Sequence, residues 1–102
     1  MTEFNLYRVY YYSAPQYNWD VRIDLYMSAA AVGTLLFMKP GKPIPPNTIS
    51  GGIPRLHFSS EHLPTMLLLL REEKPLFVNL NEANGIGTIS TSDEPVGEQE
   101  GV

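Results

Sequence analysis

The chain has 102 residues, of which 43% are hydrophobic and 18% charged, so it can build one modest hydrophobic core and is too short for two. It contains no cysteine, which excludes disulfide scaffolds, thiolate metal sites and cysteine nucleophiles, and which fits a reducing cytoplasm. The net charge of −4 arises in the last ten residues, where four acidic residues stand without a basic one.

The N-terminal part of the chain predicts strands. Residues 4–12 are rich in aromatic and β-branched side chains, which favour extended structure, and residues 13–18 form a turn. Residues 20–28 alternate between apolar and polar side chains, as expected of a strand that is buried on one face and solvated on the other. This alternation places Asp20 and Asp24 on the solvated face.

The middle of the chain predicts a central strand followed by a long loop. Residues 32–39 are apolar on both faces, which favours a position inside the sheet. Residues 40–54 hold five of the nine prolines, and because proline lacks the ladder donor, we expect no regular element there. Residues 56–59 form a short fourth strand.

A helix and a hairpin complete the predicted elements. Ser59 or Ser60 can cap the helix, Pro64 fits its first turn, and Lys74-Pro75 ends it. Residues 76–80 and 86–91 then pair around Asn84-Gly85, which supplies the positive φ angles of a tight reversal.

The helix contains four consecutive leucines, residues 67–70, which cannot all lie on one side because successive residues turn by about 100°. We therefore expect two buried faces, the second covered by a terminus or by another subunit. Leu68, with Met66 or Leu69 beside it, is the predicted subunit contact, and a symmetric homodimer is the expected assembly.

These elements predict an α+β fold: an antiparallel sheet of about four N-terminal strands, one helix packed across it, and a short C-terminal β-hairpin. Residues 1–92 are expected to form a single globular domain with a proline-rich loop over residues 40–54. Residues 93–102 are expected to form an acidic, disordered tail, because their composition offers little apolar surface to bury.

The order of four strands and a helix over about residues 4–73 is similar to the single-stranded-DNA-binding regulators of the Whirly and transcriptional-coactivator type. The resemblance rests on element order and carries no motif residues, so it implies a fold and a class of ligand but no site. An uncharacterised small bacterial family is the alternative.

Aromatic and basic residues gather in the first half of the chain and suggest a binding surface, since sequence-tolerant single-strand binders combine aromatic platforms with cations. The candidate surface comprises Tyr7, Arg8, Tyr10, Tyr12, Tyr17, Trp19, Lys39, Lys42 and Arg55. A body without net charge argues against nucleic acid, because phosphate binding draws on an excess of cations.

The sequence offers little support for a catalytic site or a metal site. His57 with a carboxylate is the minimal pair for a small hydrolase or isomerase, but no nucleophile motif accompanies it. His57 and His62 fall in different elements, so a metal site would need further ligands, and neither a metal nor a cofactor is expected.

The sequence therefore predicts a small, non-catalytic binding or interaction domain that associates with itself. A protein partner could bind through the acidic tail or the proline-rich loop, and single-stranded nucleic acid is the alternative ligand. The first six residues do not resemble a signal peptide, and residues 66–70 are the longest apolar run, so we expect a cytoplasmic protein without a membrane span.

Overall fold

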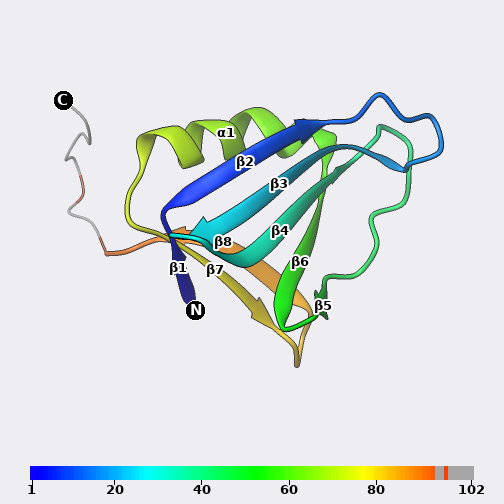
Figure 1. Ribbon diagram of the computed structural model, residues 1–102. Coiled ribbons are helices and arrows are strands. Elements are labelled where there is room, and N and C mark those ends of the chain that lie inside the picture. Colours follow the sequence, from blue (N-terminus) through cyan, green and yellow to red (C-terminus); the bar gives the residue numbers. More distant parts are fainter. Residues whose placement is uncertain (94–95, 97–102) are drawn as a thin grey trace.

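A computed structural model of the chain describes residues 1–93 and residue 96 (Figure 1). The described elements are, in chain order, β1 (Thr2–Phe4), β2 (Leu6–Tyr11), β3 (Trp19–Met27), β4 (Ala30–Met38), β5 (Thr48–Ser50), β6 (Ile53–Ser59), the 3₁₀ turn η1 (Ser60–His62), α1 (Leu63–Glu72), β7 (Leu76–Asn81) and β8 (Ile86–Thr91). The fold is α+β, as predicted. The predicted tail falls, apart from residues 93 and 96, outside the described residues.

The strands form two sheets, where we expected one antiparallel sheet of about four N-terminal strands and a separate C-terminal hairpin. The large sheet has five strands in the order β2-β3-β4-β6-β5, and the small sheet has three in the order β1-β7-β8. All pairs are antiparallel except β4 and β6, which run in parallel. The prediction of a purely antiparallel sheet was wrong because the long connection after β4 leads the chain back to the end of the sheet at which β4 begins. Strand β6 therefore runs in the same direction as β4.

The predicted strand over residues 4–12 is broken at Asn5, where the chain leaves the small sheet and enters the large one. The Asn5 backbone N–H donates to the Tyr26 carbonyl over 2.9 Å, and its side-chain oxygen accepts from the Ser28 N–H over 2.9 Å. Ser28 has a φ of 56°, in the left-handed region. Asn5 thus fixes both the corner between β1 and β2 and the turn between β3 and β4.

The proline-rich segment is more regular than its composition indicated, because it contributes β5 and the first two residues of β6. The pairing of β6 with β4 begins at Arg55, one residue after Pro54. The N–H that Pro54 lacks is therefore not needed in the ladder between β4 and β6. Asn47 anchors the segment: its side chain accepts from the His57 N–H over 2.8 Å and donates to the Gly85 carbonyl over 2.9 Å.

The hydrophobic core lies between the inner face of the large sheet and a layer made by α1 and the small sheet, which Figure 1 shows at opposite ends of that sheet. Its buried members are Phe4, Val21, Ile23, Leu25, Leu35, Phe37, Leu56, Met66, Leu70, Leu76 and Val78. The predicted apolar face of residues 20–28 is confirmed for Val21, Ile23 and Leu25, whereas Met27 at its end is exposed. The two layers approach so closely at β8 that a Cβ on Gly87 would overlap the Leu56 side chain.

Strand β4 has the central position predicted for it. Leu35 and Phe37 point into the core, whereas Leu36 and Met38 are buried on the opposite face of the sheet, where their ladder neighbours include Arg22 and Trp19. The large sheet is therefore covered on both faces in its middle.

The helix α1 buries one face within the chain. Met66 and Leu70 belong to the core, whereas Leu68 is 56% exposed and the second apolar face that we predicted has no cover among the described residues. Ser59 caps the preceding turn, accepting from the Glu61 N–H over 3.5 Å. None of the described helices has the length and apolarity that a membrane crossing requires.

Candidate functional site

Two features outside the core stand out: a layer of aromatic and arginine side chains on the outer face of the large sheet, and the free edge of β2. Residues opposite each other in a ladder share a sheet face, and the ladder between β2 and β3 places Arg8 opposite Asp24 and Tyr10 opposite Arg22. The aromatic–arginine face comprises Arg8, Tyr10, Tyr12, Tyr17, Trp19, Arg22 and Tyr26.

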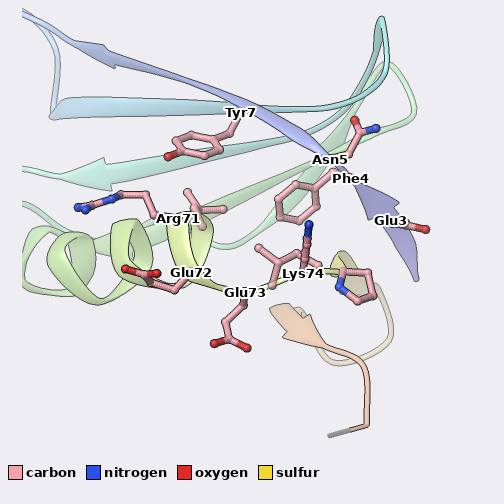
Figure 2. Close-up of a pocket in the computed structure, with 11 residues that line it drawn as sticks. Glu3, Phe4, Asn5, Tyr7, Arg71, Glu72, Glu73 and Lys74 are labelled. Atoms are coloured by element: carbon pink, nitrogen blue, oxygen red, sulfur yellow. The ribbon is translucent and has the colours of Figure 1, made fainter. Parts of the chain in front are cut away.

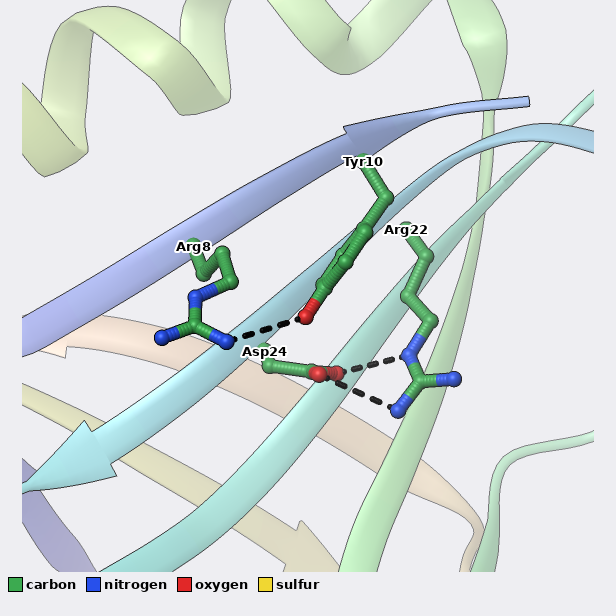
Figure 3. Close-up of polar contacts among 4 residues, drawn as sticks. All are labelled: Arg8, Tyr10, Arg22 and Asp24. Atoms are coloured by element: carbon green, nitrogen blue, oxygen red, sulfur yellow. Dashed lines mark hydrogen bonds and ion pairs between the residues drawn. The ribbon is translucent and has the colours of Figure 1, made fainter. Parts of the chain in front are cut away.

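The polar centre of this face is the ion pair between Arg22 and Asp24 (Figure 3). Nε and Nη2 of Arg22 donate to the two carboxylate oxygens over 2.8 and 3.0 Å. Asp24 is only 6% exposed, so the prediction that it lies on a solvated face was wrong. The hydrogen bond to Asp24 raises the pKa of Arg22 above its ordinary value.

Tyr10 lies between two arginines. The Arg22 guanidinium carbon stands 5.7 Å from the centre of the Tyr10 ring, and Arg8 donates to the Tyr10 hydroxyl over 3.3 Å (Figure 3). Arg8 also lies 5.9 Å from the Tyr26 ring centre, within the range of cation–π attraction. The hydrogen bond to Tyr10 raises the pKa of Arg8.

The remaining aromatic residues pack on one another. Tyr17 and Trp19 stack with ring centres 4.7 Å apart, Tyr12 meets Tyr17 edge-on at 5.4 Å, and Tyr10 and Tyr12 stack at 6.3 Å. The indole nitrogen of Trp19 is buried without a protein partner. Because the rings already use one another's faces, few of them are free to receive a stacked base.

The structure brings together five of the nine predicted binding residues, namely Arg8, Tyr10, Tyr12, Tyr17 and Trp19. Lys39 reaches the turn that precedes Trp19 and donates to the Ala14 carbonyl over 3.0 Å. Arg55 lies in β6, and Lys42 lies in the exposed loop before β5.

Tyr7 is separated from the other predicted residues, because odd-numbered residues of β2 point to the opposite face of the sheet. The predicted surface did not include Arg22 and Tyr26, which belong to the aromatic–arginine face, nor Asp24, which pairs with Arg22 on it. Their alternation along residues 20–28 was visible, but only the pairing with β2 shows that they lie beside Arg8 and Tyr10.

His57 lies on the large sheet near the proline-rich segment. Burial, and after it the charge of Arg55, lowers the pKa of His57 below 6.5, and the backbone carbonyl of Pro46, which accepts from the imidazole, opposes this shift. Its Nδ1 is buried without a protein partner. Among the described residues, no hydrogen bond or ion pair joins His57 to a carboxylate, and no three metal-ligating side chains gather in one place.

Tyr7 lines an open groove of about 730 Å³ between the C-terminal end of α1 and strands β1 and β2 (Figure 2). The groove has an apolar floor that includes Phe4 and Leu70, and a rim with both signs of charge, including Arg71 and Glu72. Figure 2 shows Tyr7 and Arg71 on the same side of the groove. The mixed charges do not favour one class of small ligand.

The second feature is the free edge of β2, the terminal strand of the large sheet. The Tyr26 carbonyl accepts from the Asn5 N–H, and the Asp20 carbonyl accepts from the Tyr12 N–H over 2.8 Å. The backbone N–H and C=O groups of the even-numbered residues of β3 are therefore directed toward β2. The backbone groups of their even-numbered partners in β2 are directed toward β3 in turn. The backbone N–H and C=O groups of Tyr7, Val9 and Tyr11 therefore point away from the sheet, and no described segment pairs with them.

Comparisons with protein families, with curated proteins and with solved structures found no match to this chain.

Proposed function

We propose that this chain is a small, non-catalytic interaction domain that associates with itself. The observation that carries the proposal is the edge of β2, which no segment of the described residues covers and which presents six residues of extended backbone without proline and with Arg8 as its one charged residue. Folded proteins usually protect such an edge with charge, proline or a covering segment, because an open edge pairs with another strand. We infer that a second chain provides the cover here.

The side chains along this edge support the same conclusion. Tyr11 is 68% exposed, and Leu6 and Tyr7 are also exposed large apolar residues. Tyrosine supplies a large contact area at a low cost in side-chain entropy and is enriched in protein interfaces. The exposed Leu68 of α1 remains the predicted helical contribution to the contact.

The other strand edges are less suited to pairing. β1 and β5 contain three residues each. β8 is longer, but Gly87 is packed against Leu56, and the turn before β8 is held by Asn47.

The aromatic–arginine face supports a non-catalytic role because its polar groups are occupied by one another. Both carboxylate oxygens of Asp24 accept from Arg22, and the Tyr10 hydroxyl accepts from Arg8. Arg22 and Trp19 of this face are the ladder neighbours of Leu36 and Met38, which are buried. We infer that this layer stabilises the sheet rather than reacting with a substrate.

Sedimentation velocity over a wide range of protein concentrations tests the proposal. We expect the full-length chain to sediment as a dimer and Tyr11→Lys to shift it toward the monomer, because a charge on an edge strand opposes pairing. Ile86→Lys is the matched control: Ile86 is an exposed apolar residue on the edge strand of the small sheet, and its replacement should leave the dimer intact.

A monomer at every concentration would overturn the proposal. Leu68→Gln tests the predicted helical contact separately, since a dimer that depends on α1 would dissociate in this variant.

A second candidate, single-stranded nucleic-acid binding, is favoured by the distribution of charge. Residues 6–59, which form the large sheet and its loops, hold five basic residues and only Asp20 and Asp24 as acids. The other nine acidic residues of the chain lie outside this range, so residues 6–59 carry a net positive charge although the whole chain carries −4. Cations beside aromatic rings are the usual platform for single strands. The predicted resemblance to the Whirly and coactivator regulators points to the same class of ligand.

Fluorescence of Trp19 tests this candidate, because Trp19 is the only tryptophan of the chain and lies in the aromatic–arginine face. A mixed-sequence single-stranded oligonucleotide should quench it at low salt and less at moderate salt. Arg8→Gln should weaken the quenching. Arg71→Gln should not, because Arg71 belongs to α1, which lies on the opposite side of the large sheet from the aromatic–arginine face. An unchanged signal at low salt would end this hypothesis.

A further inference from the structure

We propose that two copies of this chain pair strand β2 with strand β2, antiparallel, about a two-fold axis at Val9, so that the two large sheets become one continuous sheet. The inference rests on the proposed function and adds the geometry and the register of the contact.

The backbone of β2 restricts the possible registers. The groups free to pair belong to Tyr7, Val9 and Tyr11, and a symmetric antiparallel pair must place such residues opposite one another. An axis at Val9 pairs Val9 with itself and Tyr7 with Tyr11 of the second copy. This register uses all three free residues and forms about six ladder hydrogen bonds.

Registers shifted by one residue are less favourable. An axis at Arg8 leaves the edge groups of Tyr11 without a partner within β2 and sets the Arg8 guanidinium directly opposite that of the second copy. Like charges opposite each other destabilise a strand pair. An axis at Tyr10 leaves the edge groups of Tyr7 unpaired.

The side chains are self-complementary in the Val9 register. On the inner face, Tyr7 and Tyr11 form two aromatic pairs, which cover the most exposed ring of the strand. On the outer face, Arg8 lies opposite Tyr10 of the second copy, the same combination that Arg22 and Tyr10 already make within one chain. Each Tyr10 ring would then have an arginine on both neighbouring strands.

The symmetry also fixes the arrangement of the layers. A two-fold axis perpendicular to the sheet keeps both α1 helices on one side and both aromatic–arginine faces on the other. The face that surrounds Arg8, Tyr10 and Tyr26 would therefore be continuous across the dimer.

Cysteine cross-linking tests the register directly, because the chain has no cysteine of its own. Opposite Cα atoms in a hydrogen-bonded antiparallel pair lie about 5.5 Å apart, within the span of a disulfide. Under mild oxidation, full-length Val9→Cys should shift from the mass of one chain to that of two on a non-reducing gel. Arg8→Cys alone and Tyr10→Cys alone should stay at the lower mass, whereas a mixture of these two variants should form the cross-linked pair.

The outcomes separate this inference from the proposed function. A cross-link in Arg8→Cys alone or in Tyr10→Cys alone would overturn the Val9 register. A dimer that sediments as expected but cross-links through Leu68→Cys and not through Val9→Cys would leave self-association standing and place the contact on α1. A chain that sediments as a monomer would refute both. If Val9→Cys fails to fold by circular dichroism, the mixture of the Arg8 and Tyr10 variants decides the register, because those side chains lie on the outer face.

Discussion

Arg22 holds Asp24 through two hydrogen bonds, of 2.8 and 3.0 Å, on the face of the sheet that points away from the core (Figure 3). The carboxylate is almost fully buried, whereas the Arg22 side chain is 39% exposed. The pair therefore joins a buried charge to a partner that still contacts water, which lowers the cost of desolvating the arginine.

Arg22→Ala should destabilise the protein by about 1–2 kcal/mol, because Asp24 would stay buried without its donors while water replaces them in part. Urea unfolding at pH 7 measures the change. Arg8→Ala, which removes an exposed arginine from the same face, is the control and should change the free energy of unfolding by less than about 0.5 kcal/mol. Equal losses in the two variants would contradict the role of the Arg22–Asp24 pair.

Asn47→Ala should lower the free energy of unfolding by about 1–3 kcal/mol, because the half-buried His57 N–H would lose its acceptor and the Gly85 carbonyl its donor. The loop over residues 40–47 should also become more sensitive to limited proteolysis, since Asn47 ties it to β6 and to the hairpin. Asn18→Ala, at an exposed position in the turn before β3, should change neither property. Unchanged proteolysis of Asn47→Ala would show that the loop is held by other contacts.

Gly87→Ala should destabilise the protein by about 1–3 kcal/mol, although alanine usually suits a strand better than glycine. The new Cβ would overlap the Leu56 side chain, which is buried in the core and has little room to move. Thermal unfolding measures the effect. Adding Leu56→Val to Gly87→Ala should cost less than the sum of the two single changes, and strict additivity would count against the close contact.

His57 should make the stability of the protein depend on pH. Its pKa is lowered in the folded state by burial and by Arg55, so the unfolded chain takes up a proton more readily. The corresponding stability is present above the unfolded pKa of 6.5 and is lost as the pH falls through the folded pKa. Urea unfolding between pH 7 and pH 5 should therefore show a smaller loss of stability in His57→Gln than in the natural chain. His62→Gln, which changes an exposed histidine, should retain the natural slope, and an equal slope in all three proteins would disprove the role of His57.

Elements fixed by short-range signals were predicted well from the sequence. The hairpin between β7 and β8 follows from Asn84-Gly85, because a tight reversal needs a positive φ angle and Gly85 adopts one. The alternation of residues 20–28 identified the core face of β3, and the two apolar faces of residues 32–39 identified β4 as central. In each case the information lies within a few neighbouring residues.

The errors have a common cause. The break at Asn5, the parallel pairing of β4 with β6 and the short strand β5 all depend on partners that are distant along the chain. The burial of Asp24 depends on β2 and β3 lying side by side, since its ladder neighbours come from another strand. The candidate surface was recognised in part, because strand pairing separated Tyr7 from Tyr10 and added Arg22, Asp24 and Tyr26.

The sequence alone determined the fold class, the identity of most strands and the presence of one helix, because periodicity and turn residues act over short distances. The tertiary structure decided which strands meet, which backbone edge is left open and which charges are buried. These properties arise from long-range pairing, where a given strand can satisfy its hydrogen bonds with several neighbours and only the packing of the whole core selects one.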